Sequence, residues 1–209
     1  MNIASATIKS VVFWLIVVNA AIYGYMATLP DATCKNIYLF YGLSRIGLEN
    51  GSVWQFFTYG FIHYNVWHLA ANMLGLFFLG RLVERALGGW RFSLLYLLAL
   101  VGGGVGQLLL APHGEGSYLI GASGAVCGVI AVFSAIYRDS NVVLLLFFVL
   151  PIPLRGRYLG WLVLWFSFAM VVLGWQPEIG HAAHFAGCVV GYLYAWALGF
   201  GPRARNRRE

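Results

Sequence analysis

Six long apolar runs leave this sequence few folds to adopt. They cover residues 10–30, 61–82, 91–111, 123–138, 158–175 and 180–200. A helix needs roughly 20 apolar residues to cross a bilayer. Only 10% of the residues are charged, whereas soluble domains carry about 25%. We therefore expect an all-α integral membrane protein whose residues 1–209 form a single domain with six transmembrane helices.

The basic residues predict the orientation of these helices, because cytoplasmic flanks are enriched in Lys and Arg. With the N-terminus inside, only Lys35 and Arg45 of the 13 basic residues fall outside. We therefore expect both termini in the cytoplasm and a bacterial inner (cell) membrane as the location. The first run is longer than a signal-peptide core, which favours a retained anchor. The basic tail 202–209 is expected to contact lipid headgroups rather than nucleic acid.

Two segments between the runs are too short or too polar to cross a membrane. Residues 31–60 combine charges with many aromatic side chains, which suit a partly embedded external loop with short helices. Residues 142–150 are apolar but too few to span as a helix. We expect them to lie at the cytoplasmic interface before the fifth helix.

One small-residue stretch, Gly121-Ala122-Ser123-Gly124-Ala125, places a lone hydroxyl inside an uncharged region. The flanking glycines permit a sharp backbone approach, and Ser favours the start of a helix. Small residues in apolar helices also serve simply for close helix packing. The motif alone is weak, so its partners elsewhere must decide between these interpretations.

Helical rise places three polar residues at a similar depth. Ser123 lies 15 residues from the inner charge Arg138, and His184 lies 15 residues from the breaker Gly199. Both spacings correspond to about 22 Å. His68 lies 13 residues from the inner end of its run, or about 20 Å. All three are expected somewhat below the outer surface of a hydrocarbon core that is about 30 Å thick.

These polar groups form a plausible catalytic set. A serine hydroxyl needs a base within hydrogen-bond reach, and His184 can accept its proton. His68, Asn72 four residues later on the same face, and the Ser123 N–H could stabilise an oxyanion. Because no acidic residue lies at this depth, a Ser-His dyad is favoured over a triad. The alternative is that the same groups only join helices by hydrogen bonds.

Three motifs together resemble the rhomboid intramembrane serine proteases. They are His63 with His68-Leu69-Ala70-Ala71-Asn72, then Gly121-Ala122-Ser123-Gly124, then His184-Phe185-Ala186-Gly187 with Gly191. The resemblance covers the second to the sixth helix in family order and includes Gly80 and Glu84. It implies a six-helix rhomboid-like bundle.

The resemblance also implies residue roles. Ser123 would be the nucleophile and His184 the base and then the acid, with His68, Asn72 and the Ser123 N–H as the oxyanion hole. His63 would support that hole. Substrates would be transmembrane protein segments, unwound near the outer face and cleaved beside small residues. Gating would involve the fifth helix and a cap loop at 174–180, and no cofactor or metal is implied.

Two departures from the family pattern stand out. The external loop reads Trp54-Gln55 where members often have Trp-Arg, which leaves the anchoring of the loop open. Four residues after the serine, Cys127 replaces an aromatic that often packs on the catalytic ring. We expect Cys127 and Cys188 to be neighbours across the helix seam.

The other polar side chains have simpler interpretations. His113 and His181 are expected to be solvated, since metal binding lacks a third convincing ligand. Ser93, Ser134 and Ser167 are expected to bond carbonyls of their own helices. Two competing functions remain: a catalytically silent relative that binds membrane clients, and a small transporter. Retention of the serine and histidine disfavours the first, and the lack of inverted repeats and intramembrane acids disfavours the second. The oligomeric state is left open.

Overall fold

A computed structural model describes residues 10–111, 118–146, 150–175 and 179–201. The tail at 202–209, His113 and the centre of the expected cap loop lie outside these residues. The described helices are α2 (Val11–Met26), α3 (Asp31–Tyr41), α4 (Arg45–Glu49), α5 (Gln55–Thr58), η1 (Tyr59–Phe61), α6 (Val66–Gly75), the π-helical turn η2 (Leu76–Gly80), α7 (Arg81–Leu87), α8 (Gly89–Leu110), α9 (Ser123–Ile136), α10 (Gly156–Leu173) and α11 (His181–Ala197). The described strands are β1 (Asn141–Leu146) and β2 (Leu150–Arg155).

Three helical stretches are long and apolar enough to cross a membrane. They are Val66–Leu87, which joins α6, η2 and α7, then Gly89–Leu110 and Gly156–Leu173. The apolar helices α2 and α9 are shorter. With 14 residues, α9 extends over only about 21 Å. Each expected run thus contains a helix, and the protein is a mostly helical membrane protein.

The second long helix differs at both ends from its predicted bounds of 61–82. Its start is at Val66, because the Asn65 side chain accepts a hydrogen bond from the His68 N–H at 2.8 Å. Its end is at Leu87, where Gly88 follows as the C-cap with a φ of +81°, so Glu84 lies inside the helix and does not close it. The Glu84 carboxylate instead accepts hydrogen bonds from the N-terminus of α2, at 2.7 Å from Ser10 Oγ and 2.6 Å from the Val11 N–H.

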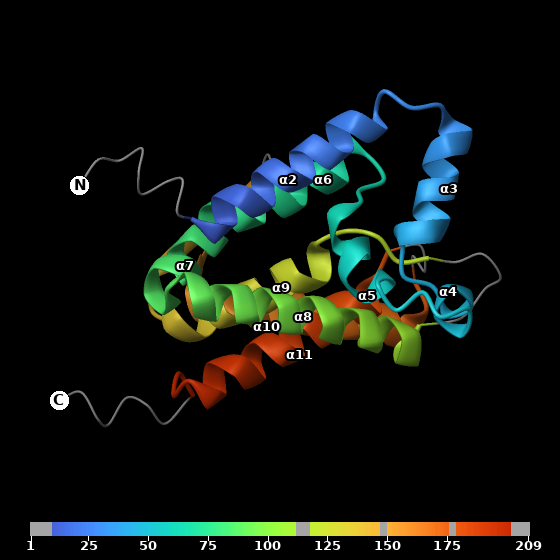
Figure 1. The fold of residues 1–209 in the computed structure, drawn as a ribbon. Helices are drawn as coiled ribbons and strands as arrows, with labels where there is room; N and C mark the ends of the chain where they lie inside the picture. Colours follow the sequence, from blue (N-terminus) through green and yellow to red (C-terminus); the bar gives the residue numbers. More distant parts are fainter. Residues whose placement is uncertain (1–9, 112–117, 147–149, 176–178, 202–209) are drawn as a thin grey trace.

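Figure 1 shows how the helices surround α9. α11 packs most extensively on α9 and α8, and α10 packs on both α9 and α11. α2 lies along α6 and η2. The start of α2, α7 and the end of α11 lie at one end of the molecule, whereas α3, α4 and α5 gather at the other.

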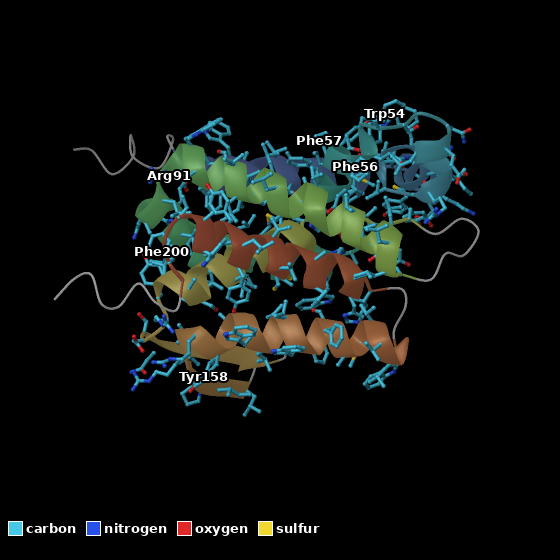
Figure 2. All side chains as sticks on the ribbon, turned by 90° about the horizontal axis from the view of Figure 1, so that it is seen from below. Trp54, Phe56, Phe57, Arg91, Tyr158 and Phe200 are labelled. Carbon is cyan, nitrogen blue, oxygen red and sulfur yellow. The ribbon has the colours of Figure 1, made fainter. Side chains whose placement is uncertain are left out.

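The segment between α2 and α6 is held in place by Gln55. Its Oε1 accepts a hydrogen bond from the Ser44 N–H at 3.0 Å. Its Nε2 donates to the carbonyls of Leu39 and Phe40 at 3.2 and 3.1 Å. Gln55 is fully buried, so a neutral amide anchors this segment at the position where the family often has Arg. Figure 2 labels the neighbouring aromatics Trp54, Phe56 and Phe57 at this end, with Arg91, Tyr158 and Phe200 at the opposite end.

Residues 141–146 and 150–155 pair as two antiparallel strands, a local departure from the all-α expectation in a mostly helical protein. β1 and β2 pair antiparallel, with Val143 opposite Pro153 and Leu145 opposite Pro151. Proline has no N–H, so both are non-hydrogen-bonded pairs and both proline nitrogens face the free edge of β2. Figure 2 shows the strands beside the first part of α10.

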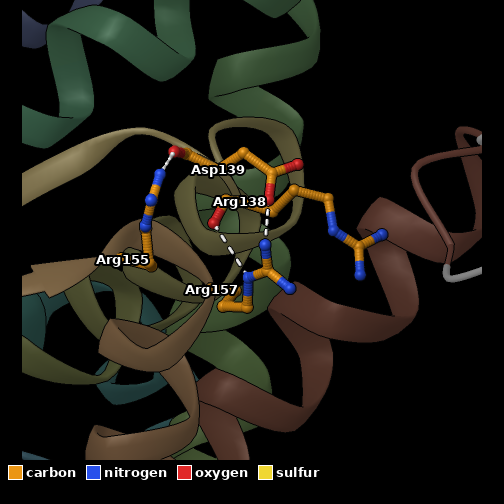
Figure 3. Close-up of polar contacts among 4 residues, drawn as sticks. All are labelled: Arg138, Asp139, Arg155 and Arg157. Carbon is orange, nitrogen blue, oxygen red and sulfur yellow. Dashed lines mark hydrogen bonds and ion pairs between the residues drawn. The ribbon is translucent and has the colours of Figure 1, made fainter.

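Arginines close the base of this hairpin, as Figure 3 shows. Arg157 forms an ion pair with Asp139. Arg155 donates to the Asp139 carbonyl at 2.8 Å, and the Arg157 N–H donates to the Arg138 carbonyl at 3.0 Å. The ion pair is exposed on both sides, so it contributes little to stability. The backbone bonds fix where β2 leads into α10.

Candidate active site

Ser123 and His184 meet across the seam between α9 and α11. His184 Nε2 lies 2.7 Å from Ser123 Oγ. Ser123 is the first residue of α9, and His184 lies in the first turn of α11. A hydrogen bond of this length joins a hydroxyl to a group that can accept its proton.

Glycines allow the two helices to approach closely enough for this contact. A Cβ at Gly187 would collide with the carbonyl oxygen of Gly124, and one at Gly191 would collide with that of Gly128. The backbones of α9 and α11 therefore touch directly. Any larger residue at Gly187 would push the His184 ring away from Ser123.

Gly121 shapes the turn that leads into α9. Its φ is +111°, a conformation that favours glycine. A Cβ there would also collide with the His68 ring at Nε2. The Gly121 N–H donates to the Tyr59 carbonyl at 2.8 Å. The structure thus places the His68 ring against the backbone two residues before Ser123.

Asn72 is buried one turn further along the same helix. Its Nδ2 donates to the His68 carbonyl at 3.0 Å. In the part of the chain that the structure describes, no hydrogen bond joins Asn72 to Ser123. The structure therefore brings Ser123, His184 and His68 to one place and leaves Asn72 bonded within its own helix.

His63 lies in the loop before α6 and packs against His68, with ring centroids 4.9 Å apart. Burial, and secondarily the charge of His68, lowers the pKa of His63 to about 3. The ring is therefore neutral, and its Nε2 can accept a hydrogen bond from the Ala122 N–H at 3.4 Å. His63 thus links His68 to the segment that carries Ser123.

Cys127 and Cys188 are both buried beneath the pair. Cys188 Sγ lies 3.4 Å from the Cys127 carbonyl oxygen. Both pack in one cluster with Leu164 of α10. Small side chains at these positions keep α9 and α11 in contact below the hydroxyl and the ring.

His181 is the clearest correction at the site. It was predicted to be solvated, yet only 6% of its surface is exposed. The Phe166 ring of α10 lies 6.0 Å from the His181 ring and shields it. Its spacing of three residues from His184 was a signal that both rings share a face of one helix.

Two other polar residues take part in packing around the site. Gln107 of α8, which sequence reasoning did not single out, accepts a hydrogen bond from the Ala183 N–H at 3.3 Å through Oε1 and caps the start of α11. An amide inside an apolar helix is a detectable signal for such a role. Ser134 was expected to bond its own helix, but its Oγ accepts the Gly160 N–H of α10 at 2.7 Å. Ser93 does bond its own helix, at 2.9 Å to the Gly89 carbonyl.

The described residues contain no group of three His, Cys, Asp or Glu that could hold a metal ion. A hydroxyl bonded to an imidazole, at the N-terminus of a helix, is an arrangement suited to nucleophilic attack on a carbonyl.

Comparison with known proteins identifies the family of this chain. The family model described as "Rhomboid domain" matches residues 50–200. The chain belongs to the rhomboid family. It is similar to Rhomboid protein 1, mitochondrial, of Saccharomyces cerevisiae, with 29% identity over 96% of this chain and 57% of that protein. It is also similar to Rhomboid protease GlpG of Salmonella newport, with 29% identity over 74% of this chain and 51% of that protein.

Rhomboid relatives come from several membranes. Rhomboid-like protein 11, chloroplastic, of Arabidopsis thaliana is 29% identical over 92% of this chain and 67% of that protein. The chain spans only about half the length of several of these rhomboid proteins. Since mitochondrial, chloroplastic and bacterial proteins all match, the similarity supports an integral membrane protein and gives no support to the bacterial inner membrane over an organellar one.

Proposed function

We propose that this protein is an intramembrane serine endopeptidase that hydrolyses peptide bonds of transmembrane substrates near the outer membrane face. The observation that carries the proposal is the 2.7 Å contact between His184 Nε2 and Ser123 Oγ. Ser123 is the nucleophile, and His184 is the general base and then the general acid.

In the first step, His184 takes the proton of Ser123 as Oγ attacks the carbonyl carbon of the scissile bond. The carbonyl electrons move to oxygen, and the Ser123 N–H and the His68 ring stabilise the resulting oxyanion. Asn72 joins them once its amide leaves the His68 carbonyl. The C–N bond then breaks, and His184 protonates the leaving amine.

In the second step, a water molecule attacks the acyl ester on Ser123 while His184 takes its proton. Collapse of this second tetrahedral intermediate returns the proton to Ser123 and releases the carboxylate product. Gly121, Gly124, Gly187 and Gly191 support the site by allowing the close approaches described above, and Cys127 fills the space beneath Ser123. No cofactor takes part in this scheme.

The membrane arrangement belongs to the same proposal. Six helices span the bilayer, both termini lie in the cytoplasm, and α3–α5 lie at the outer face. Ser123 begins a helix of about 21 Å, which supports a reaction site below the outer surface. Lipid headgroups are partners at both faces, and substrates enter as single membrane-spanning segments.

Labelling with a fluorophosphonate probe tests the proposal. The probe reacts with a serine only when a base activates the hydroxyl, so we expect the detergent-solubilised protein to label and Ser123→Ala and His184→Ala to remain unlabelled. Cleavage of a single-span substrate reconstituted in liposomes should be lost in the same two variants.

Two results would contradict the proposal. Equal labelling of the unaltered protein and Ser123→Ala would remove Ser123 as the nucleophile. No labelling and no cleavage by the unaltered protein, in a preparation that still unfolds cooperatively, would favour a catalytically silent relative that binds membrane clients.

A further inference from the structure

His181 presents two polar atoms that the described part of the chain leaves without a hydrogen-bond partner. Both ring nitrogens are buried, and neither has a hydrogen-bond partner among the described residues. Buried polar groups nearly always have a partner, because leaving one unpaired costs free energy. Because the described residues leave both nitrogens of this buried imidazole unpaired, the ring has room for a further hydrogen-bond partner.

The position of the ring limits what this partner can be. The His181 and His184 ring centroids lie 5.8 Å apart, with the rings at 89°. His184 in turn contacts Ser123, so a group bound by His181 lies next to the reacting atoms. The His181 ring also meets Phe166 of α10. The His181 ring thus contacts both the candidate base and α10.

An unwound peptide segment has the complementary need. Once a helical substrate opens near the site, its backbone N–H and C=O groups lose their partners, and each unpaired group is costly in an apolar environment. A neutral imidazole offers one donor and one acceptor, and therefore matches either group of an extended backbone.

We propose that His181 is a substrate-binding residue whose ring hydrogen-bonds the backbone of the unwound segment beside the scissile bond. This inference rests on the proposed proteolytic function for its ligand, but not on the chemical step. It assigns a side chain at the start of α11 to binding the substrate rather than to activating Ser123.

Two substitutions separate this role from a structural one. His181→Phe keeps an aromatic ring against Phe166 and His184 but removes both nitrogens. His181→Gln keeps a donor and an acceptor. Since His181→Phe removes two unpaired polar atoms from a buried position, its melting temperature should equal or exceed that of the unaltered protein.

The test measures binding in a Ser123→Ala background, so that it does not depend on cleavage. The probe is a synthetic single-span peptide with an Ala-Gly pair near one end of its apolar segment, fluorescently labelled and reconstituted with the protein in phosphatidylcholine liposomes. We expect His181→Phe to weaken binding about 3- to 10-fold, the effect of one lost hydrogen bond, and His181→Gln to bind within about 2-fold of the parent.

A parallel measurement follows fluorophosphonate labelling in proteins that retain Ser123. Labelling of His181→Phe should stay within about 3-fold of the unaltered protein, because the probe lacks a peptide backbone. Unchanged peptide binding by His181→Phe would overturn the proposal, as would a lowered melting temperature with a matching loss of labelling. Peptide binding that depends on His181 in a protein that neither labels nor cleaves would refute the proposed protease and leave this binding role intact.

Discussion

Gly121 carries two constraints on a single residue. Its φ of +111° disfavours any side chain, and the place of a Cβ is taken by the His68 ring. Both constraints act at the turn that delivers the Ser123 N–H to the site. Glycine here is therefore required by the site as well as by the fold.

We predict that Gly121→Ala displaces His68 and reduces the rate of fluorophosphonate labelling by about 10²-fold or more, the usual effect of losing one oxyanion donor. The strained backbone should also cost about 1–3 kcal/mol in the free energy of unfolding. Gly24→Ala on α2 is a matched control, since nothing lies within 4 Å of its new Cβ. Labelling of Gly121→Ala at the unaltered rate would contradict the assigned position of His68.

For single residues, the sequence predicted that Ser123, His68 and His184 lie close together, because polar side chains are conspicuous in apolar helices. It failed for His181. A depth estimate from helical rise gives only the height of a residue, and the burial of His181 depends on Phe166, which reaches it from a different helix. Contacts of that kind are set by packing and have no local signal.

Among the elements, α10 is joined to α9 by a buried hydrogen bond in addition to apolar packing. Ser134 Oγ accepts the Gly160 N–H at 2.7 Å, and both groups are buried. The contact matters for function because α10 is the helix expected to move when a substrate enters. The base of the hairpin adds further hydrogen bonds at the start of the same helix.

We predict that Ser134→Ala lowers the free energy of unfolding by about 1 kcal/mol, the contribution of one buried hydrogen bond. Ser93→Ala is the matched control. The Ser93 hydroxyl bonds a carbonyl of its own helix, and alanine is a better helix former, so no loss is expected. Thermal unfolding in one detergent compares the three proteins, and equal losses for both variants would contradict a specific link between α9 and α10.

Helix positions followed from the apolar runs, but helix ends did not. Asn65 caps the start of the second helix, and Gly88 caps its end. Glu84, which was expected to close that helix, bonds Ser10, 74 residues away. The hairpin was missed because residues 142–150 are apolar throughout and give no alternating pattern. The length of that segment correctly excluded a spanning helix. Length alone does not predict which residues pair as strands.

For the whole molecule, the described chain begins and ends at the same end of the helical bundle, opposite to α3–α5. This arrangement fits an even number of crossings. The side of the membrane on which each end lies is predicted from the basic residues alone and calls for a direct measurement.

We predict that Asn50→Cys reacts with a membrane-impermeant maleimide in intact expressing cells, whereas Asp139→Cys reacts only after the cells are opened. Both positions are exposed, Asp139 with 61% of its side chain. Cys34→Ser in both variants removes the partly exposed native thiol, and Cys127 and Cys188 are buried. Complete labelling after denaturation is the control, and the reverse pattern would invert the proposed orientation.

The two prolines of β2 have a consequence for neighbouring copies of this protein. Membrane proteins diffuse in two dimensions, where an open strand edge meets other chains often. An incoming strand needs N–H donors as well as carbonyls to extend a sheet. Pro151 and Pro153 take two donors away from that edge, and the next N–H facing it is that of Arg155 at the end of the strand. We therefore expect the β2 side of the hairpin to pair poorly with a strand of a neighbouring copy, even in a crowded membrane.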